Sequence, residues 1–187
     1  MKYRNIISFF LIGFFVASSC FANEKEASHK AQVVIPEVAL LALQFEGTSA
    51  LDLIGNAPDI AGDQVNLKST NSSKVWLNYS SVVTKNQKRK VTATIVGGVP
   101  EGVILRLNAM ESTGQGRGEM GSSNGKVALS NNPTDIISGI GSCYTGKGIQ
   151  NGYLLSYEVE IDSDQLYQNN QSKEATLSVV YTLTDDN

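Results

Sequence analysis

Histidine and cysteine are almost absent from this chain of 187 residues, which contains one histidine and two cysteines. The single histidine, His29, lies in a polar stretch near the N-terminus, which leaves none for a Ser-His-Asp relay in the body of the chain. The same scarcity leaves too few soft ligands for a zinc site. Asp162 and Asp164 offer two carboxylates, but Asp-Ser-Asp after a strand is more typical of a turn. The sequence therefore predicts no enzyme, with no catalytic residue, no metal site and no cofactor.

Long apolar runs are absent as well, except at the N-terminus. The chain opens with Met-Lys-Tyr-Arg-Asn and continues with the apolar run IISFFLIGFFVA. A positive region followed by a short hydrophobic one is typical of a secretory signal. The run is shorter than the roughly 20 apolar residues that a membrane-spanning helix needs. We predict cleavage after Ala22; the alternative is a lipoprotein signal that is cut before Cys20.

The signal sets the expected organisation of the chain. Residues 1–22 form a cleaved signal helix, residues 23–30 a flexible polar leader, and residues 31–187 a single domain. We expect export through the inner membrane to the periplasm, the cell surface or the extracellular medium. The mature chain is expected to have no membrane span.

Positive charge is scarce in the mature part. Cleavage after Ala22 removes Lys2 and Arg4 and no acidic residue, which lowers the 15 basic residues to 13 against 18 acidic ones. Nucleic-acid binding depends largely on Lys and Arg that neutralise phosphates, so no nucleic-acid partner is expected.

Cys143 is then the only cysteine, which excludes an intramolecular disulfide. We expect Cys143 to be a small residue buried in a glycine-rich bend; the alternative is that it is a reactive thiol or forms an intermolecular bridge.

A long helical period is missing, whereas alternation with a period of two is frequent. In residues 153–162, YLLSYEVEID, one face of a strand would be buried and the other, with Glu158 and Glu160, would face water. Residues 174–185 behave likewise, with Val179 facing inward and Thr182 outward. Short strands with turn residues between them and no interleaved helices predict an antiparallel β-sandwich. The other expected strands are residues 31–35, 38–45 (as a fully buried strand), 64–68, 74–83, 89–96, 102–110, 125–130 and 134–140.

Two glycine-rich segments imitate nucleotide-binding motifs. GSCYTGKG, residues 141–148, matches all but the last position of the phosphate loop, and GRGEMG, residues 116–121, matches G-x-G-x-x-G. Both motifs need a following helix whose N-terminal amides face the phosphates. Here each segment is followed by a strand pattern, so we expect loop glycines and no bound nucleotide.

Two groups of residues are candidates for contact with a ligand. The run KNQKRK contains Lys85, Lys88, Arg89 and Lys90 and is most simply a charged hairpin tip, but it could attract an acidic glycan or a lipid headgroup. Trp76 lies on the opposite strand face from Val75 and Leu77, so it either covers the core or stacks on a sugar ring.

The features together resemble exported fimbrial or pilin-type subunits of Gram-negative bacteria. The resemblance rests on the signal, on the segment AQVVI after the leader, on a sandwich without disulfides, and on the last strand EATLSVVYTLT. It implies an immunoglobulin-like fold in which a neighbouring subunit supplies a missing strand. Ala31, Val33 and Ile35 would be the donated side chains, through main-chain pairing at an open sheet edge.

Two functions therefore remain. The first is an exported structural or adhesive surface subunit that acts through contacts with other copies of itself or with related surface subunits. The alternative is a monomeric periplasmic or secreted glycan-binding module; Pro36 interrupts AQVVI and the cysteine pair of many pilins is missing. An N-terminal segment that leaves its own domain would favour the first, and one that closes its own sheet the second.

Overall fold

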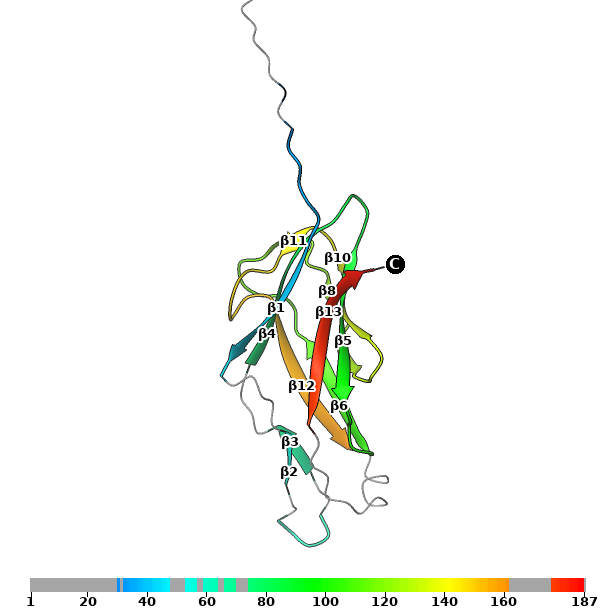
Figure 1. Ribbon diagram of the computed structural model, residues 1–187. Helices are drawn as coiled ribbons and strands as arrows, with labels where there is room; N and C mark the ends of the chain where they lie inside the picture. Colours follow the sequence, from blue (N-terminus) through cyan, green and yellow to red (C-terminus); the bar gives the residue numbers. More distant parts are fainter. Residues whose placement is uncertain are drawn as a thin grey trace, which may run out of the picture. The chain divides into compact units, whose positions relative to one another are not determined.

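The computed structural model describes residues 30, 32–47, 53–56, 59–63, 66–69, 74–161 and 176–186. Within these ranges the chain forms thirteen strands and no helix (Figure 1). All of the strands belong to one compact unit, Ile35–Asn187. The predicted signal helix, and the leader apart from Lys30, lie outside the described residues. Within the described ranges, no helix is long and apolar enough to cross a membrane.

The strands form two main antiparallel sheets, as the sequence predicts. The larger sheet has the order β7–β11–β4–β12–β6–β9, and β1 pairs with the opposite edge of β4. Its strands are β1 (Val38–Glu46), β4 (Lys74–Val82), β6 (Val103–Ala109), β7 (Arg117–Gly118), β9 (Lys126–Ala128), β11 (Cys143–Tyr144) and β12 (Tyr153–Ile161). The smaller sheet has the order β13–β5–β10–β8. Its strands are β5 (Arg89–Gly97), β8 (Ser122–Ser123), β10 (Thr134–Ile140) and β13 (Leu177–Asp185). A separate pair consists of β2 (Leu53–Asn56) and β3 (Asn66–Ser69).

One hydrophobic core lies between the two main sheets. Leu77 and Leu107 of the larger sheet and Val91 and Ile137 of the smaller sheet are all fully buried. The strands that supply them are rich in β-branched and aromatic residues, which pack well on a pleated surface. Residues on β4 and β5 enter the core at every second position, as the period of a strand requires. The structure is therefore a β-sandwich with a single core.

The chain changes sheet at most of its connections. It passes from β4 in the larger sheet to β5 in the smaller one, back to β6, and later from β10 to β11 and from β12 to β13. The turn after β4 carries the run KNQKRK, so the prediction of a hairpin tip is wrong: β4 and β5 do not pair with each other. The turn instead joins the two sheets, and the last two residues of the run, Arg89 and Lys90, already belong to β5.

The long predicted strands are confirmed, with boundaries that differ by at most three residues. The prediction that residues 38–45 form a fully buried strand is wrong in one respect. They do form β1, but it lies at an edge, and Leu40 is 65% exposed. The described residues 32–37 form no strand, in contrast to the prediction for 31–35. The short strands β7, β8 and β11 were not predicted, because two residues carry no period.

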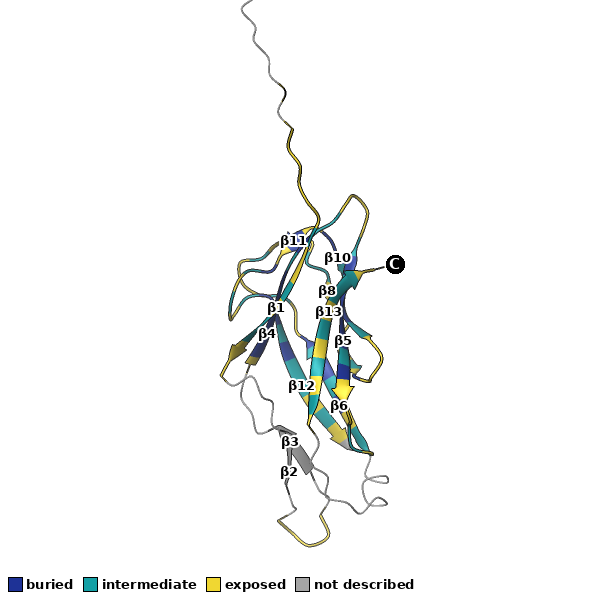
Figure 2. Ribbon diagram, in the orientation of Figure 1, coloured by how far each residue is buried: buried dark blue, intermediate teal, exposed yellow. Residues whose placement is uncertain are grey.

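The facing of the last two strands is confirmed, although their burial is less complete than expected. Leu155 is buried, and Glu158 and Glu160 are exposed. On β13 the residues alternate between half-buried and exposed, as Figure 2 shows, with Val179 inward and Thr182 outward. The inward residues of β13 pack against the core without being enclosed, because β13 is the last strand of its sheet.

This gradient of burial predicts a gradient of stability. Leu107→Ala removes a fully buried side chain and should lower the free energy of unfolding by about 3 kcal/mol. Val179→Ala removes two methyl groups from a half-buried position and should cost about 1 kcal/mol. Thr182→Ala on the outer face should change it by less than about 0.5 kcal/mol. Urea denaturation of the three variants would measure this order, and equal effects of Val179→Ala and Thr182→Ala would contradict the assigned face.

Candidate functional site

Arg89, a residue of the basic run, is buried between the sheets rather than displayed on the surface. Its side chain lies on the inner face of β5 and is 9% exposed. Its guanidinium donates to the carbonyl oxygens of Val38 and Val82, and pairs with Asp185 on β13 at 3.2 Å. Glu37 adds a second carboxylate at 3.7 Å. Arg89 thus closes this end of the core by connecting β1, β4, β5 and β13.

The other basic residues of the run differ in whether they are free to contact a ligand. Lys90 is hydrogen-bonded to Asp135 at 3.0 Å, which raises the pKa of its ammonium, and Asp186 lies 3.8 Å away. Lys88 pairs with Glu119 of the glycine-rich segment. Lys85 forms no ion pair within the described part of the chain. The four predicted ligand contacts therefore do not form one free cationic surface; contact through Lys85 remains a prediction.

Trp76 lies on the outer face of β4, between Gln44 of β1 and Leu154 of β12. It is nevertheless only 8% exposed, and its indole N–H is buried without a hydrogen-bond partner among the described residues. Stacking on a sugar needs an open ring face. Trp76 could serve as the predicted ligand contact only if the residues that cover its ring moved away. Its role stays a prediction.

The two glycine-rich segments lie side by side, which explains both false nucleotide motifs. Thr113 pairs with Gly152, and Gly118 of β7 pairs with Cys143 of β11. A Cβ on Gly118 would lie 2.3 Å from the carbonyl oxygen of Ser142, and the residue has φ 91°, a conformation that glycine adopts readily. Glycine at every second position of residues 114–118 allows this close approach. The glycines are therefore packing residues of a strand-like segment, and neither segment precedes a helix.

Polar side chains hold the second segment, residues 145–152, against β4. Thr145 is fully buried and bonds the backbone of Tyr79. Asn78 donates to the carbonyl of Asn151 at 2.6 Å and accepts from the amide of Gly148. Asn151 in turn donates to two carbonyls of its own segment and accepts from the amide N–H of Gln115. A loop with this many hydrogen bonds to β4 and within itself has a defined conformation.

Two stacked tyrosines hold the first segment. The rings of Tyr79 and Tyr153 lie 5.9 Å apart and nearly parallel, at 16°. Both hydroxyls donate to the carbonyl of Met120, and Tyr153 also bonds the carbonyl of Gly121 at 2.8 Å. Burial raises the pKa of both hydroxyls, which keeps them protonated as donors. The segment that contains Arg117 is thereby fastened to the core.

Cys143 is buried, as expected, but it belongs to β11 rather than to a bend. Its side chain faces the core at 9% exposure, and burial raises the pKa of the thiol to about 11. The thiolate is the reactive form of cysteine, so Cys143 in the fold is neither a reactive thiol nor ready for an intermolecular bridge. Elsewhere in the described ranges, no group of three or more His, Cys, Asp or Glu residues is placed to hold a metal ion.

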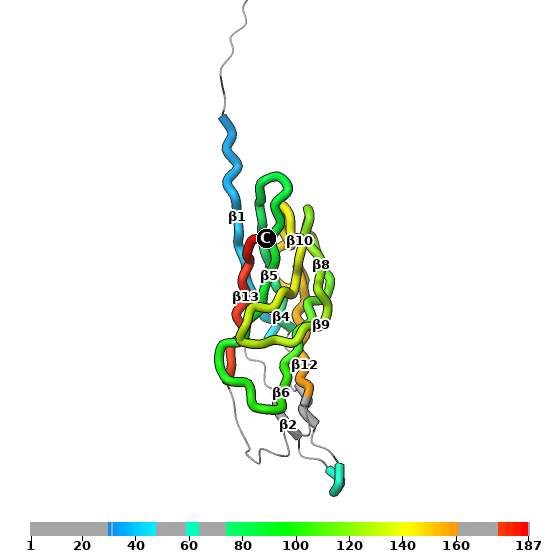
Figure 3. The backbone as a smooth tube through the Cα atoms, turned by 90° about the vertical axis from the view of Figure 1, so that its right-hand side faces the viewer, coloured from blue at the N-terminus to red at the C-terminus, as the bar shows by residue number. Residues whose placement is uncertain are grey.

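The first and last described long strands leave two sheet edges open. Within the described ranges, β1 pairs only with β4, and β13 pairs only with β5. The two strands contact each other across the layers, and Figures 1 and 3 both show them side by side. Their inward side chains pack on the core but stay partly exposed; they are Leu41, Leu43, Leu177, Val179, Tyr181 and Leu183. This seam between β1 and β13 is the least enclosed part of the core.

The predicted strand-pairing segment contributes exposed apolar side chains. Val33 is 84% exposed and Ile35 is 77% exposed, while Ala31 lies outside the described residues. Two further residues were missed in the sequence: Tyr144, which is 47% exposed, and Arg117 opposite it on β7. The only signal for Arg117 was the period of two in residues 114–118, which is hidden because every second residue there is glycine.

The burial of Arg89 predicts a large and specific effect on stability. Arg89→Ala leaves the Asp185 carboxylate and the carbonyls of Val38 and Val82 without their donor and removes the ion pair with Glu37, and should lower the free energy of unfolding by about 3 kcal/mol. Lys126→Ala is the control, because it breaks an exposed ion pair with Glu158 and should cost at most about 1 kcal/mol. Thermal or urea denaturation measures both. A loss as small as the control's would show that Arg89 does not hold the sheets together.

The raised pKa of Cys143 predicts slow modification. Its value of about 11, against 9.0 for a free thiol, reduces the thiolate fraction at pH 8 by about a hundredfold. A disulfide reagent such as DTNB should therefore react with the chain lacking residues 1–22 at least about a hundredfold more slowly in buffer than in denaturant. One thiol should titrate in denaturant. Equal rates in both conditions would contradict the buried position.

The chain was compared with known proteins by sequence and by structure. No family model matches it, and no curated protein or solved structure matches it significantly. The geometry of the described residues is therefore the basis of any functional conclusion.

Proposed function

We propose that the protein is an exported structural subunit of a bacterial surface assembly, in which residues 31–35 of one copy pair with the open edge of another. The observation that carries the proposal is the exposure of the apolar side chains Val33, Val34 and Ile35, at 84%, 72% and 77%. Apolar residues that follow one another in an extended, exposed segment are uncommon unless another surface covers them. The signal that the sequence predicts for residues 1–22 supports export.

The seam between β1 and β13 is the surface that suits this segment. Unpaired amides and carbonyls at a sheet edge pair readily with an added strand. The partly exposed side chains of the seam, among them Leu43 and Val179, provide an apolar surface for alternate side chains of such a strand. The donated side chains would be Ala31, Val33 and Ile35, while Val34 would point away from the core of the partner.

The length of the segment limits the strength of this contact. Five extended residues cover about 16 Å, whereas the nine residues of β13 extend about 30 Å. Burial of Val33 and Ile35 contributes about 2 kcal/mol each, which alone corresponds to a dissociation constant of about 1 mM. Backbone hydrogen bonds add to this value, and the cost of association opposes it. We expect weak self-association that becomes strong only where copies are concentrated.

An immunoglobulin-like connectivity is part of the proposal. It is supported by the two antiparallel sheets and by the repeated passage of the chain between them. The alternative function, a monomeric glycan-binding module, needs the segment to return to its own sheet. The described residues 32–35 belong to no strand, which favours assembly.

Replacement of Val33 by Asp tests the assembly. The charge would enter the apolar seam of the partner, so the variant should lose self-association at least tenfold while it stays folded. Val34→Asp is the matched control, since it places the same charge one residue away on the outward face and should leave association nearly unchanged. Sedimentation equilibrium of the chain lacking residues 1–22, up to about 1 mM, measures both variants.

Two results would contradict the proposal. The first is a wild-type chain that stays monomeric at the highest concentration. The second is an equal loss of association for Val33→Asp and Val34→Asp, because pairing through one strand face requires the two positions to differ. A lower melting temperature of Val33→Asp without any change in association would favour the monomeric alternative.

A further inference from the structure

Four residues form a line across the outer face of the larger sheet. Tyr144 of β11 is directly opposite Ser80 of β4 and Arg117 of β7, and Ser80 is opposite Leu40 of β1. Residues directly opposite in antiparallel strands point to the same face. The neighbouring Cys143 and Ser81 face the core, so this line faces away from it. We call the set of Leu40, Ser80, Tyr144 and Arg117 the β11 row.

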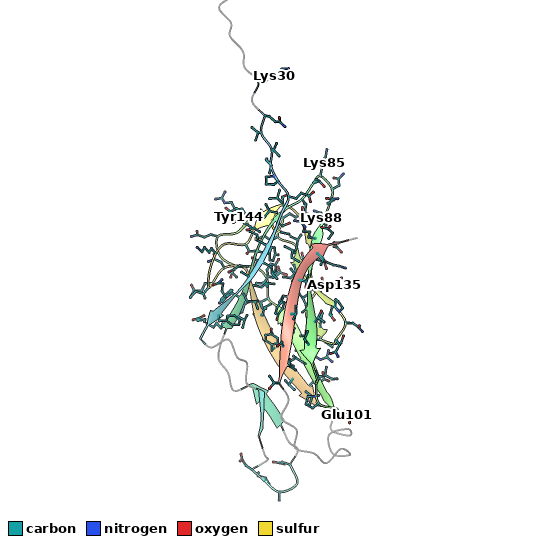
Figure 4. All side chains as sticks on the ribbon, in the orientation of Figure 1. Lys30, Lys85, Lys88, Glu101, Asp135 and Tyr144 are labelled. Atoms are coloured by element: carbon teal, nitrogen blue, oxygen red, sulfur yellow. The ribbon has the colours of Figure 1, made fainter. Side chains whose placement is uncertain are left out.

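The tyrosine of the row differs from every other described tyrosine. The hydroxyls of Tyr79 and Tyr153 bond backbone carbonyls, and those of Tyr157 and Tyr181 bond each other. In the described part of the chain, the Tyr144 hydroxyl has no hydrogen-bond partner, and the side chain is 47% exposed. Figure 4 shows Tyr144 at the same end of the domain as Lys85 and Lys88. An amphipathic ring is thus presented to solvent with a free polar end.

The arginine of the row is an exception as well. Arg89 pairs with Asp185, and Arg106 pairs with Glu160. Arg117 is exposed and has no ion pair with any described residue. The carboxylate two residues further along the chain, Glu119, is already paired with Lys88. The one described tyrosine and the one described arginine that lack protein partners therefore lie directly opposite each other.

The backbone beneath the row is held firmly. A Cβ on Gly116, just before β7, would lie 2.9 Å from the carbonyl oxygen of Tyr144, so the chain there approaches β11 too closely for any side chain. Thr145, which follows Tyr144, is fully buried and bonded to Tyr79. A site whose backbone is ordered before binding loses little conformational entropy when a ligand arrives. Such a rigid base is what a small, weakly held ligand requires.

We propose that the β11 row binds an acidic saccharide, a pyranose that carries a carboxylate. The guanidinium of Arg117 can hold a carboxylate through two parallel hydrogen bonds. The electron-rich face of the Tyr144 ring suits the C–H face of a sugar, whose hydrogens carry a small positive charge. Ser80 and the free tyrosine hydroxyl supply hydrogen bonds for sugar hydroxyls. Four neighbouring strands span about 14 Å, which is long enough for a short oligosaccharide.

Charge argues for a single carboxylate rather than a polyanion. The chain has a formal net charge of −3, which repels a polyanion such as a nucleic acid. One free guanidinium beside an aromatic ring matches one carboxylate next to an apolar ring face.

The site goes beyond the proposed assembly, because one copy of the domain supplies all four of its residues and neither residues 31–35 nor the β13 edge belongs to it.

NMR titration tests the site in the chain lacking residues 1–22 and carrying Val33→Asp, which removes the proposed assembly contact. The probes are 3′-sialyllactose and digalacturonic acid, which carry the carboxylate on different sugars, and lactose is the neutral control. We expect at least one acidic probe to shift the amide signals of Ser80, Tyr144 and Arg117, with a dissociation constant of about 1 mM, and lactose to bind at least about tenfold more weakly. The probe that binds identifies the source of the carboxylate.

Variants separate the site from general charge effects. Tyr144→Ala and Arg117→Gln should each weaken binding about tenfold or more. Tyr144→Phe should retain most of it, since the ring remains. Lys126→Gln, on the same outer face at β9, should have no effect. Absence of binding of both acidic probes at about 20 mM, equal binding of lactose, or full binding by the Tyr144→Ala and Arg117→Gln variants would each overturn the proposal. These results do not depend on assembly, which sedimentation of the unmodified chain tests separately.

Discussion

Strand β4 is the element on which the rest of the structure depends, because both of its edges are paired and its inner face and the middle of its outer face are buried. β1 pairs with one edge along all nine residues, and β11 and β12 share the other edge. Its inner face contributes Leu77 and Tyr79 to the core, and even the outward Trp76 and Asn78 are buried. In a mature chain that would have one cysteine and no disulfide, this central strand is what the surrounding strands and loops are attached to.

The polar groups near β4 decide where the irregular segments lie. Asn78 and Asn151 satisfy backbone groups that a long loop would otherwise leave unpaired, and the stacked tyrosines do the same for the segment around Met120. Buried polar groups without partners are costly, so these bonds define one conformation for two glycine-rich segments. The functional consequence is a fixed outer surface at β7 and β11, which displays Tyr144 and Arg117.

The seam between β1 and β13 is stabilised differently. No strand in the described ranges joins the two edges, and the side chains along the seam are only partly enclosed. Arg89 compensates at one end, where it connects β1 and β13 through Val38 and Asp185. The sandwich is therefore well held at this end and open along its edges, which suits a domain that adds a strand from outside.

The sequence by itself determined the local structure where a strand is long enough to show its period. The antiparallel sheets, the facing of Val179 and Thr182, and the strand that follows GSCYTGKG could all be read from alternation, because the period of two is a property of the backbone. Exclusion of a helix after the glycine-rich segments followed from the same pattern.

Only the tertiary structure decided how strands are grouped. β4 and β5 are neighbours in sequence but belong to different sheets, so a run that reads as a free basic tip contains a buried arginine. Likewise the pairing of Tyr144 with Arg117 joins residues 27 positions apart through a register of two residues, and no local pattern encodes a contact that depends on where two glycine-rich segments meet.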